Sequence, residues 1–310
     1  MNKTNVLILG GSGQLAACFI DVLNNLTDKI DFISFPKSLM NITDKKNISN
    51  YLSKKKVDYL INCAAYTDVP RAEVNEDTAI FTNGYGPKVL AECCLESGTK
   101  LIHFSTDFAF GGSITPETED NTPNPLNTYG KTKVLGEQEI VKLAEQSKKL
   151  EYMIIRTSWL YSEYGKNFVK TILKKVINRE DMQVVVDQIG SPTYAKDLAK
   201  FVVYDVILSG KEFKSGIYHY SNQGNISWYD FANAIAEIYN EVQLDLGRET
   251  SIVPYNISPS YTSEANQNVK RPRVVMLDKR QVVRDYDTVI PYWRTSLKNV
   301  ITKLVIDGGM

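Results

Sequence analysis

A tyrosine and a lysine are spaced so that they could share one acid–base task. Tyr129 and Lys133 lie four residues apart in a segment with a helical pattern, and side chains at that spacing face the same way. A phenol titrates near pH 10, so it works at neutral pH only if its phenolate is stabilised. An ammonium about 4 Å away contributes at most about 4 kcal/mol, or roughly three pKa units. We therefore expect Lys133 to lower the pKa of Tyr129, and Tyr129 to protonate a carbonyl that receives a hydride.

The same spacing also occurs by chance in a chain with 18 tyrosines, and Tyr51 and Lys55 show it in a polar, apparently exposed helix. The surroundings favour the Tyr129 pair. An apolar strand pattern upstream ends in Ser105-Thr106-Asp107, and hydroxyls at the carboxyl end of a central strand are placed to bond a substrate carbonyl. Helix capping is the other common use of such hydroxyls.

A glycine loop follows the first expected strand and opens the first expected helix. Gly10, Gly13 and Ala16 fit the pattern G-x-x-G-x-x-A. Such a loop turns tightly and brings helix N-terminal amides close to a pyrophosphate. Its place within the first strand–helix–strand unit predicts a dinucleotide-binding site.

The second expected strand bears on which dinucleotide binds. An enzyme that prefers NAD usually has an acidic residue there for the ribose 2′-hydroxyl. Here the segment runs through Ser34 and Phe35 to Lys37 and Ser38, with a cation and no carboxylate. Because Lys37 can meet a 2′-phosphate, the sequence favours NADP(H), with NAD(H) as the alternative.

The elements that must position these residues alternate along the first half of the chain. Several strand patterns are continuous apolar runs, as expected for parallel strands buried on both faces. The alternation predicts an α/β fold with a doubly wound parallel sheet of the Rossmann type. The expected strands are residues 6–9, 30–35, 58–64, 100–104 and 152–156, and the expected helices are residues 14–26, 48–54, 86–97 and about 126–149.

The alternation of strand and helix patterns becomes less regular after residue 157. We expect residues 1–157 to form the dinucleotide-binding domain, and residues 158–310 to form mainly a smaller C-terminal substrate lobe, with some segments returning to the first domain. Helices are expected at residues 167–178, 195–208, 228–242 and 296–305, with Ser227 and Asp230 as a capping pair for the third. Ligands of open α/β sheets bind beyond the carboxyl ends of the strands, where this lobe would lie.

Composition excludes several classes of protein. The 310 residues carry 36 basic and 36 acidic side chains, so nothing favours a nucleic-acid or membrane-surface partner. Four cysteines and two histidines match no zinc pattern and suggest free thiols in a reducing compartment. Leu15-Ala16-Ala17-Cys18 superficially resembles a lipoprotein cleavage site, but the apolar run before it has only four residues, Val6-Leu7-Ile8-Leu9. We expect a cytoplasmic protein with no metal, as a monomer or homodimer.

Eight segments spread over nearly the whole chain strengthen this interpretation. They are residues 10–16, 62–67, 105–110, 127–133, 156–159, 167–168, 187–193 and 270–272. With these segments the sequence resembles the extended short-chain dehydrogenase/reductase family, and within it the dTDP-4-dehydrorhamnose reductases. The resemblance implies reduction of the 4-keto group of a nucleotide-linked 6-deoxyhexose by NAD(P)H.

The resemblance also implies roles for individual residues. Tyr129 would donate the proton, Lys133 would support it and bind the ribose, and Thr106 would orient the carbonyl. The cofactor would contact Gly10, Gly13, Gln14, Leu15, Lys37, Asn41, Ile42, Ala64, Ala65, Tyr66, Tyr129 and Lys133. The sugar nucleotide would contact Thr106, Asp107, Trp159, Asn167, Gln188 and Arg271, the last as a bidentate phosphate ligand.

Three positions depart from the family pattern. The family often has Asp where Asn41 stands, an acidic residue where Pro70 stands, and Tyr where Phe108 stands, which puts the particular sugar in doubt. Dehydratases of this fold would need a second carboxylate after Asp107, and Phe108 occupies that place. A sugar-nucleotide 4-epimerase with tightly bound NAD and a non-catalytic regulatory subunit of the same fold remain the alternatives.

Overall fold

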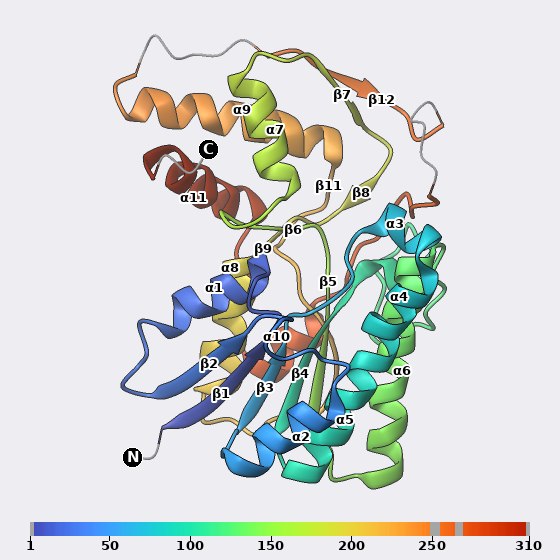
Figure 1. Cartoon of the computed structure of the whole chain (residues 1–310). Helices are drawn as coiled ribbons and strands as arrows, with labels where there is room; N and C mark the ends of the chain where they lie inside the picture. Colours follow the sequence, from blue (N-terminus) through green and yellow to red (C-terminus); the bar gives the residue numbers. More distant parts are fainter. Residues whose placement is uncertain (1–2, 249–254, 264–268, 308–310) are drawn as a thin grey trace.

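A computed structural model describes residues 3–248, 255–263 and 269–307 of the chain. Its centre is a six-stranded, wholly parallel sheet in the order β10-β5-β4-β3-β1-β2 (Figure 1). The Rossmann-like α/β class expected from the sequence is confirmed. The strands are β1 (Thr4–Leu9), β2 (Ile30–Phe35), β3 (Tyr59–Asn62), β4 (Lys100–Thr106), β5 (Tyr152–Thr157) and β10 (Gly216–His219).

Successive residues of each strand serve two cores. Ile8 of β1 packs with α1 on one face of the sheet, whereas its neighbour Leu7 packs with α2 and α5 on the other. Side chains of a strand alternate between faces, so continuous apolar runs fill both cores. The first core is covered by α1 (Gln14–Leu23), α8 (Ala195–Lys200), a π-helical continuation (Phe201–Ile207) and α10 (Arg280–Tyr286). The second is covered by α2 (Lys45–Lys54), α5 (Gly86–Ser97) and α6 (Thr128–Ser147).

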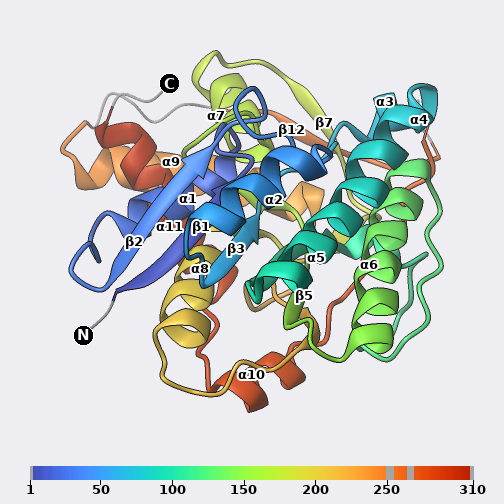
Figure 2. The same ribbon diagram turned by 60° about the horizontal axis from the view of Figure 1, so that its bottom comes forward.

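A smaller lobe with its own core lies beyond the carboxyl ends of the sheet strands, as Figure 1 shows. In Figure 2, which is turned by 60° so that the bottom comes forward, α2, α5 and α6 stand in front of the lobe. Its helices are α7 (Phe168–Ile177), α9 (Trp228–Asp245) and α11 (Trp293–Ile306). Its short strand pairs are β7 (Met182–Val185) with β12 (Ile257–Ser260), β8 (Ile189–Gly190) with β11 (Ile226–Ser227), and β6 (Leu160–Tyr161) with β9 (Thr193–Tyr194).

Side-chain caps explain where two helices begin, α9 in the lobe and α6 in the sheet layer. Ser227 and Asp230 form the expected capping box of α9, and Asn127 caps α6 by accepting from the Gly130 backbone N–H at 2.9 Å. Four short elements were not predicted from the sequence. They are α3 (Val69–Val74), α4 (Glu76–Ile80), a π-helical turn (Phe81–Tyr85) and a 3₁₀ turn (Asp107–Ala109).

Three further observations concern the lengths of the helices, the possible metal ligands and the cysteines. None of the helices in the described part of the chain is both long and apolar enough to cross a membrane. The same residues hold no cluster of three or more His, Cys, Asp or Glu side chains suited to a metal ion. All four cysteines are free thiols.

Candidate active site

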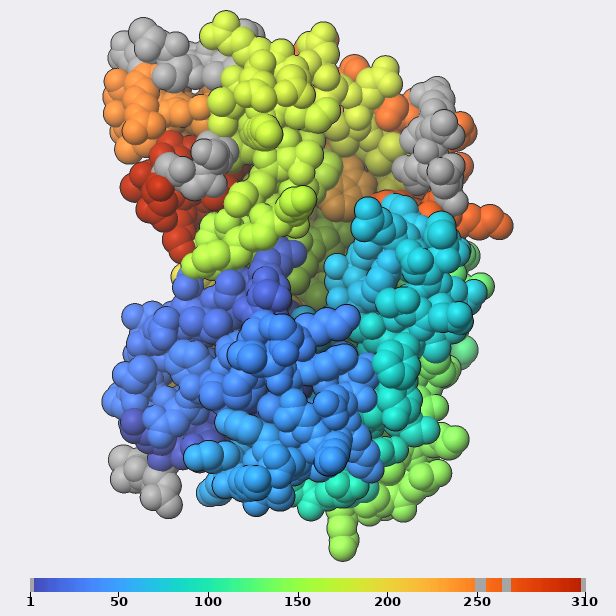
Figure 3. Space-filling view, in the orientation of Figure 1, coloured from blue at the N-terminus to red at the C-terminus, as the bar shows by residue number. Residues whose placement is uncertain are grey.

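A cavity of about 480 Å³ opens between the carboxyl edge of the sheet and the lobe. The space-filling view shows the surface hollowed between these two parts (Figure 3). Both halves of the chain contribute to its wall. Of the residues predicted from sequence, the cavity brings together Gly13, Gln14, Leu15, Ala64, Ala65, Thr106, Asp107, Tyr129, Lys133, Trp159, Asn167, Gln188 and Arg271.

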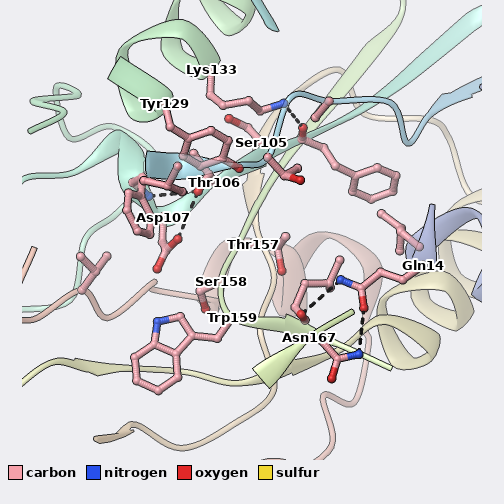
Figure 4. A pocket seen from close by; sticks show the side chains of 18 of the residues that line it. Gln14, Ser105, Thr106, Asp107, Tyr129, Lys133, Thr157, Ser158, Trp159 and Asn167 are labelled. Carbon is pink, nitrogen blue, oxygen red and sulfur yellow. Dashed lines mark hydrogen bonds between the residues drawn. The ribbon is translucent and has the colours of Figure 1, made fainter. Parts of the chain in front are cut away.

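The N-terminus of α6 sets the position of Tyr129. A β-carbon on Gly130 would come 2.3 Å from the Phe108 carbonyl oxygen, so only glycine allows the helix this close to the end of β4. Phe108 packs edge-on against the Tyr129 ring, with centroids 5.7 Å apart. Figure 4 shows the phenol facing Thr106 in the cavity. The close approach of helix and strand end places a phenol and a hydroxyl where they can hold one carbonyl oxygen.

The electrostatics of Tyr129 differ from the sequence-based expectation. Burial raises its pKa to about 12, and the Asp107 charge adds to this, while the Thr106 hydroxyl opposes it. The expected lowering by Lys133 was wrong for this state of the site. The reason is geometric: Lys133 Nζ donates instead to the Phe104 carbonyl oxygen at 2.7 Å (Figure 4). Tyr129 is therefore a fully protonated donor at neutral pH.

Lys133 and Asp107 both have perturbed acidities. Burial lowers the pKa of Lys133 to about 8, against a smaller raising effect of Glu137. Burial raises the pKa of Asp107 to about 7, although the Thr106 hydroxyl, 3.2 Å away, donates to its carboxylate. Shifted pKa values from desolvation within a cleft are typical of functional sites.

The glycine loop lies against the neighbouring strands. Gly10 has a φ of +85°, and a β-carbon there would lie 2.6 Å from the Ala64 backbone nitrogen. The backbone amides of Gly10 and Gly11 both donate to the Phe35 carbonyl, at 3.1 and 2.9 Å, which brings the end of β2 to the loop. Gly13 is the N-cap of α1 and lines the cavity. This helix N-terminus opens onto the cavity and is suited to a pyrophosphate.

Five of the expected cofactor residues lie outside the cavity wall: Gly10, Lys37, Asn41, Ile42 and Tyr66. Gly10 forms the turn just described. Lys37 is exposed beyond the end of β2, and Ile42 is buried in the core under α2 and α5. The Asn41 side chain accepts from the Thr43 amide, and the Tyr66 backbone pairs with the Asn83 side chain.

An aromatic stack closes the lobe side of the cavity. The Trp159 indole stacks on Trp228 with centroids 3.6 Å apart and planes within 8°. Trp159 has a φ of +44°, an uncommon conformation for a large residue. A β-carbon on Gly190 would lie 2.7 Å from the Trp159 ring, so this glycine makes room for the indole. The strained backbone is thus fixed by packing around the ring, as functional sites often require.

Gln14 and Asn167 join the sheet layer to the lobe, and Gln188 and Arg271 complete the predicted part of the wall. Gln14 donates to the Leu160 carbonyl at 3.3 Å, and Asn167 donates to Gln14 at 3.4 Å, as Figure 4 shows. Asn167 also caps α7. Gln188 donates to Thr262 at 3.2 Å. Arg271 is half-buried in the wall, and burial lowers its pKa.

Sequence reasoning missed several wall residues, among them Thr67, Thr157, Ser158, Lys166 and Trp228. Thr157 is the most informative, because its buried Oγ1 has no hydrogen-bond partner among the described residues. Buried hydroxyls are almost always bonded, so an orphaned one in a cavity wall suggests a ligand contact. Its place at the carboxyl end of β5, beside Thr106 of β4, was the signal that could have found it.

The comparisons with known proteins agree over nearly the full chain. A sequence model described as the RmlD substrate binding domain matches residues 4–306. The spore coat polysaccharide biosynthesis protein SpsK of Bacillus subtilis strain 168 is 35% identical over 96% of this chain and 97% of its own length. A dTDP-4-dehydrorhamnose reductase of Aggregatibacter actinomycetemcomitans is 34% identical over 95% and 97%.

A solved structure gives the same picture in three dimensions. The crystal structure of dTDP-4-dehydrorhamnose reductase from Bacillus anthracis strain Ames, in complex with NADP, matches with a TM-score of 0.86 at 32% identity. The match covers 97% of this chain and 100% of that one.

Proposed function

The chain belongs to the RmlD substrate-binding domain family, and on that premise we propose that it reduces the 4-keto group of a nucleotide-linked 6-deoxyhexose with NADP(H). The substrate would be dTDP-4-dehydrorhamnose or a close analogue, and the product the corresponding alcohol. The observation that carries the proposal is the meeting of Thr106, Tyr129 and Lys133 in one cavity with the helix N-terminus at Gly13.

The residues present fit a bound dinucleotide. The Gly10 and Gly13 turn leaves room for a diphosphate above the N-terminus of α1, and Ala64 and Ala65 line the cavity beside it. Lys37 follows β2, whose end is hydrogen-bonded to the glycine loop, and it would meet a 2′-phosphate. When bound, the nicotinamide would supply the hydride.

The chain's own residues would handle the developing charge on the carbonyl oxygen. Tyr129 Oη, protonated at neutral pH because its pKa is about 12, would give its proton to that oxygen. The Thr106 hydroxyl would hold the carbonyl in line. Lys133, in its charged form, would stabilise the phenolate left behind, since an ammonium nearby favours the ionised phenol.

The lobe would hold the rest of the substrate. Trp159 and Trp228 offer a flat apolar surface to a sugar or base, and Asn167 and Gln188 offer amide contacts. Arg271 would bind the diphosphate, for which a guanidinium is geometrically suited. The orphaned Thr157 hydroxyl is a further candidate donor to the sugar.

The first experiment follows NAD(P)H oxidation with freshly generated dTDP-4-keto-6-deoxy-L-mannose, using both cofactors in turn. Rapid oxidation that requires the sugar nucleotide supports the proposal. A folded protein that binds cofactor but oxidises none of it contradicts this substrate. Tightly bound NAD in the purified protein, seen in its absorbance spectrum, would favour a 4-epimerase instead.

The first variant is Tyr129→Phe. Because the phenyl ring keeps the packing against Phe108 but has no proton to give, we expect kcat to fall by at least about 100-fold, the lower end of general acid–base effects. Tyr51→Phe is the matched control, since Tyr51 has the same lysine spacing but packs on Phe35 away from the cavity. Equal rates for Tyr129→Phe and the wild type would remove Tyr129 from the mechanism.

We also propose a cytoplasmic protein that acts as a monomer or homodimer. The four free cysteines support this location, because thiols persist in a reducing compartment.

A further inference from the structure

A chain of hydrogen bonds runs from the Ala64 backbone N–H through Asn62 and His103 to Lys133. The Ala64 backbone N–H can only donate, and it donates to Asn62 Oδ1 at 3.0 Å. This bond orients the Asn62 amide, so Nδ2 must be the atom that faces β4. Asn62 is the last residue of β3 and is buried.

The oriented amide fixes the state of a buried histidine. Asn62 Nδ2 lies 2.9 Å from His103 Nδ1, and an amide nitrogen can only donate. His103 Nδ1 must therefore accept. Burial lowers the pKa of His103 well below its usual value, and the Lys133 charge adds to this, so the ring is neutral. A neutral ring whose Nδ1 accepts carries its proton on Nε2.

Lys133 stands at the end of this chain. Its Nζ lies 3.4 Å from His103 Nε2 and 2.7 Å from the Phe104 carbonyl oxygen. An ammonium has three donors and no acceptor, so it opposes an N–H that points at it. A neutral amine has one lone pair for His103 Nε2–H and still donates to the Phe104 carbonyl. Every bond in the chain is satisfied only when the amine is neutral.

We propose that Asn62 locks His103 as its Nε2–H tautomer and that His103 thereby acts as a positioning residue that disfavours the charged form of Lys133. The consequence for catalysis rests on the proposed reductase function, whereas the state of the two side chains in the free protein does not. A negative group that binding or reaction supplies next to Lys133 would then raise the pKa of its amine and complete its charge.

Three other titratable groups of the site bear on the charge of Lys133. Glu137, one turn along α6, favours the charged amine, but its carboxylate is occupied by bonds from Arg156 at 2.6 and 3.1 Å and by the Ser105 hydroxyl. Tyr129 on the same helix is protonated at neutral pH. Asp107, next to the end of β4, is held near half-ionisation by burial, which raises its pKa to about 7.

The chain contains an internal control, because it has only two histidines. His219 is also buried, and its Nδ1 lies 3.1 Å from the Glu117 carbonyl oxygen while its Nε2 faces Arg156 NH1 at 3.5 Å. A carbonyl only accepts and a guanidinium only donates, so His219 must be the Nδ1–H tautomer. The two histidines are therefore expected to be opposite tautomers in one spectrum.

The decisive experiment is a long-range ¹H–¹⁵N correlation spectrum of the full-length free protein labelled at its histidine rings, recorded from roughly pH 6 to 9. Lys133→Met is the companion variant, because its side chain keeps the length of the stem without an amine. We expect His103 as Nε2–H and His219 as Nδ1–H throughout. The His103 shifts should follow one titration that is absent from Lys133→Met, while the His219 shifts stay constant.

Two results of that spectrum would overturn the proposal. One is His103 as the Nδ1–H tautomer or as an imidazolium. The other is a His103 titration that persists unchanged in Lys133→Met. Because neither needs a substrate, both are distinguishable from failure of the proposed reaction.

A second readout uses the pH dependence of kcat/KM for NADPH, which reports groups of the free enzyme. His103→Phe keeps a ring but removes the N–H, so we expect the alkaline limb to move to higher pH. The ratio of variant to wild-type rate should then rise across that limb. A merely structural loss would lower the rate by the same factor at every pH, and that result would count against the proposal.

Discussion

At the scale of single residues, burial rather than charge pairing governs the acid–base groups of this site. The pKa of Tyr129 rises to about 12, that of Lys133 falls to about 8 and that of Asp107 rises to about 7, each chiefly by desolvation. In each case the shift favours the neutral form. Lys133 and Asp107 therefore titrate close to neutral pH, so binding or reaction can change their charge at little cost.

The raised pKa of Asp107 should make the free energy of unfolding depend on pH. The pKa of its carboxyl is raised from 3.8 to about 7 in the folded state, so the folded chain binds a proton that the unfolded chain loses. The resulting penalty is absent near pH 4, grows as pH rises and is complete above about pH 7. Asp107→Asn removes the penalty and should stabilise the protein at pH 8 by up to about 4 kcal/mol relative to pH 4. Denaturant unfolding at the two pH values measures it, and an equal effect at both would contradict it.

Lys37 should decide between the two nicotinamide cofactors. It is exposed just after β2, whose last residue accepts two hydrogen bonds from the glycine loop. Lys37→Ala should raise KM for NADPH by several-fold, since a partly exposed ion pair contributes about 1 kcal/mol or less. KM for NADH, measured on the same variant, is the control and should not change. Equal changes for both cofactors would place Lys37 outside the 2′-phosphate site.

At the scale of elements, a buried ion pair ties the site helix to the sheet. Glu137 of α6 takes three hydrogen bonds from the Arg156 guanidinium of β5, and Ser105 of β4 donates to the same carboxylate. Both charged side chains are at most 3% exposed. Because Glu137 lies one helical turn after Lys133, this pair fixes the depth at which α6 presents its catalytic residues.

Removing one partner should therefore be costly. Glu137→Gln leaves the Arg156 charge unpaired in the interior, and we expect a loss of about 3–5 kcal/mol in the free energy of unfolding. The matched control is Glu139→Gln on the same helix, whose partner Lys88 is 43% exposed, so its loss should be below about 1 kcal/mol. Urea unfolding of both variants tests the difference. Similar losses would mean that the buried pair has no special role.

The sequence predicted most of the elements because their signals are local. The apolar run at residues 100–104 and the glycine loop gave β4 and the start of α1, and the Ser227–Asp230 capping pair gave the start of α9. The misses have physical reasons. The strand Gly216–His219 has only four residues, and its partner in the sheet is the distant strand β5. The expected single helix at 195–208 divides into an α-helix and a π-helical segment.

In the site, too, residues on one element were predicted from the sequence, whereas contacts between distant segments were not. Tyr129 and Lys133 were found from their spacing, since one helix carries both. The direction in which the Lys133 amine points was not predicted, because the carbonyl that accepts its hydrogen bond belongs to β4, 29 positions earlier in the chain. Trp228 was missed for the same reason, because its stacking partner Trp159 lies far earlier in the chain.

At the scale of the whole molecule, the two parts are interleaved rather than joined at one point. The core under α1 takes its other half from segments after residue 157, namely α8, the π-helical segment, β10 and α10. Asp21 of α1 accepts from the Tyr164 hydroxyl at 2.6 Å and from Lys196 at 3.0 Å, which adds polar links between the halves. A cavity wall drawn from both parts depends on this arrangement.

The boundary at residue 157 can therefore be tested by cutting the chain there. A fragment of residues 1–157 ends with β5 but lacks β10, α8 and α10, so the part of that sheet face which α1 does not cover would be open to water. Burial of apolar surface is the main driving force for folding, and each large apolar side chain left exposed forfeits about 1.5–3 kcal/mol. That loss, over many side chains, exceeds the 5–15 kcal/mol that stabilises a typical domain. We expect the fragment to give no cooperative thermal transition, whereas the full chain unfolds cooperatively under the same conditions. A fragment with a sharp transition and NADPH binding would instead establish residues 1–157 as an independent domain, with the later segments as additions to it.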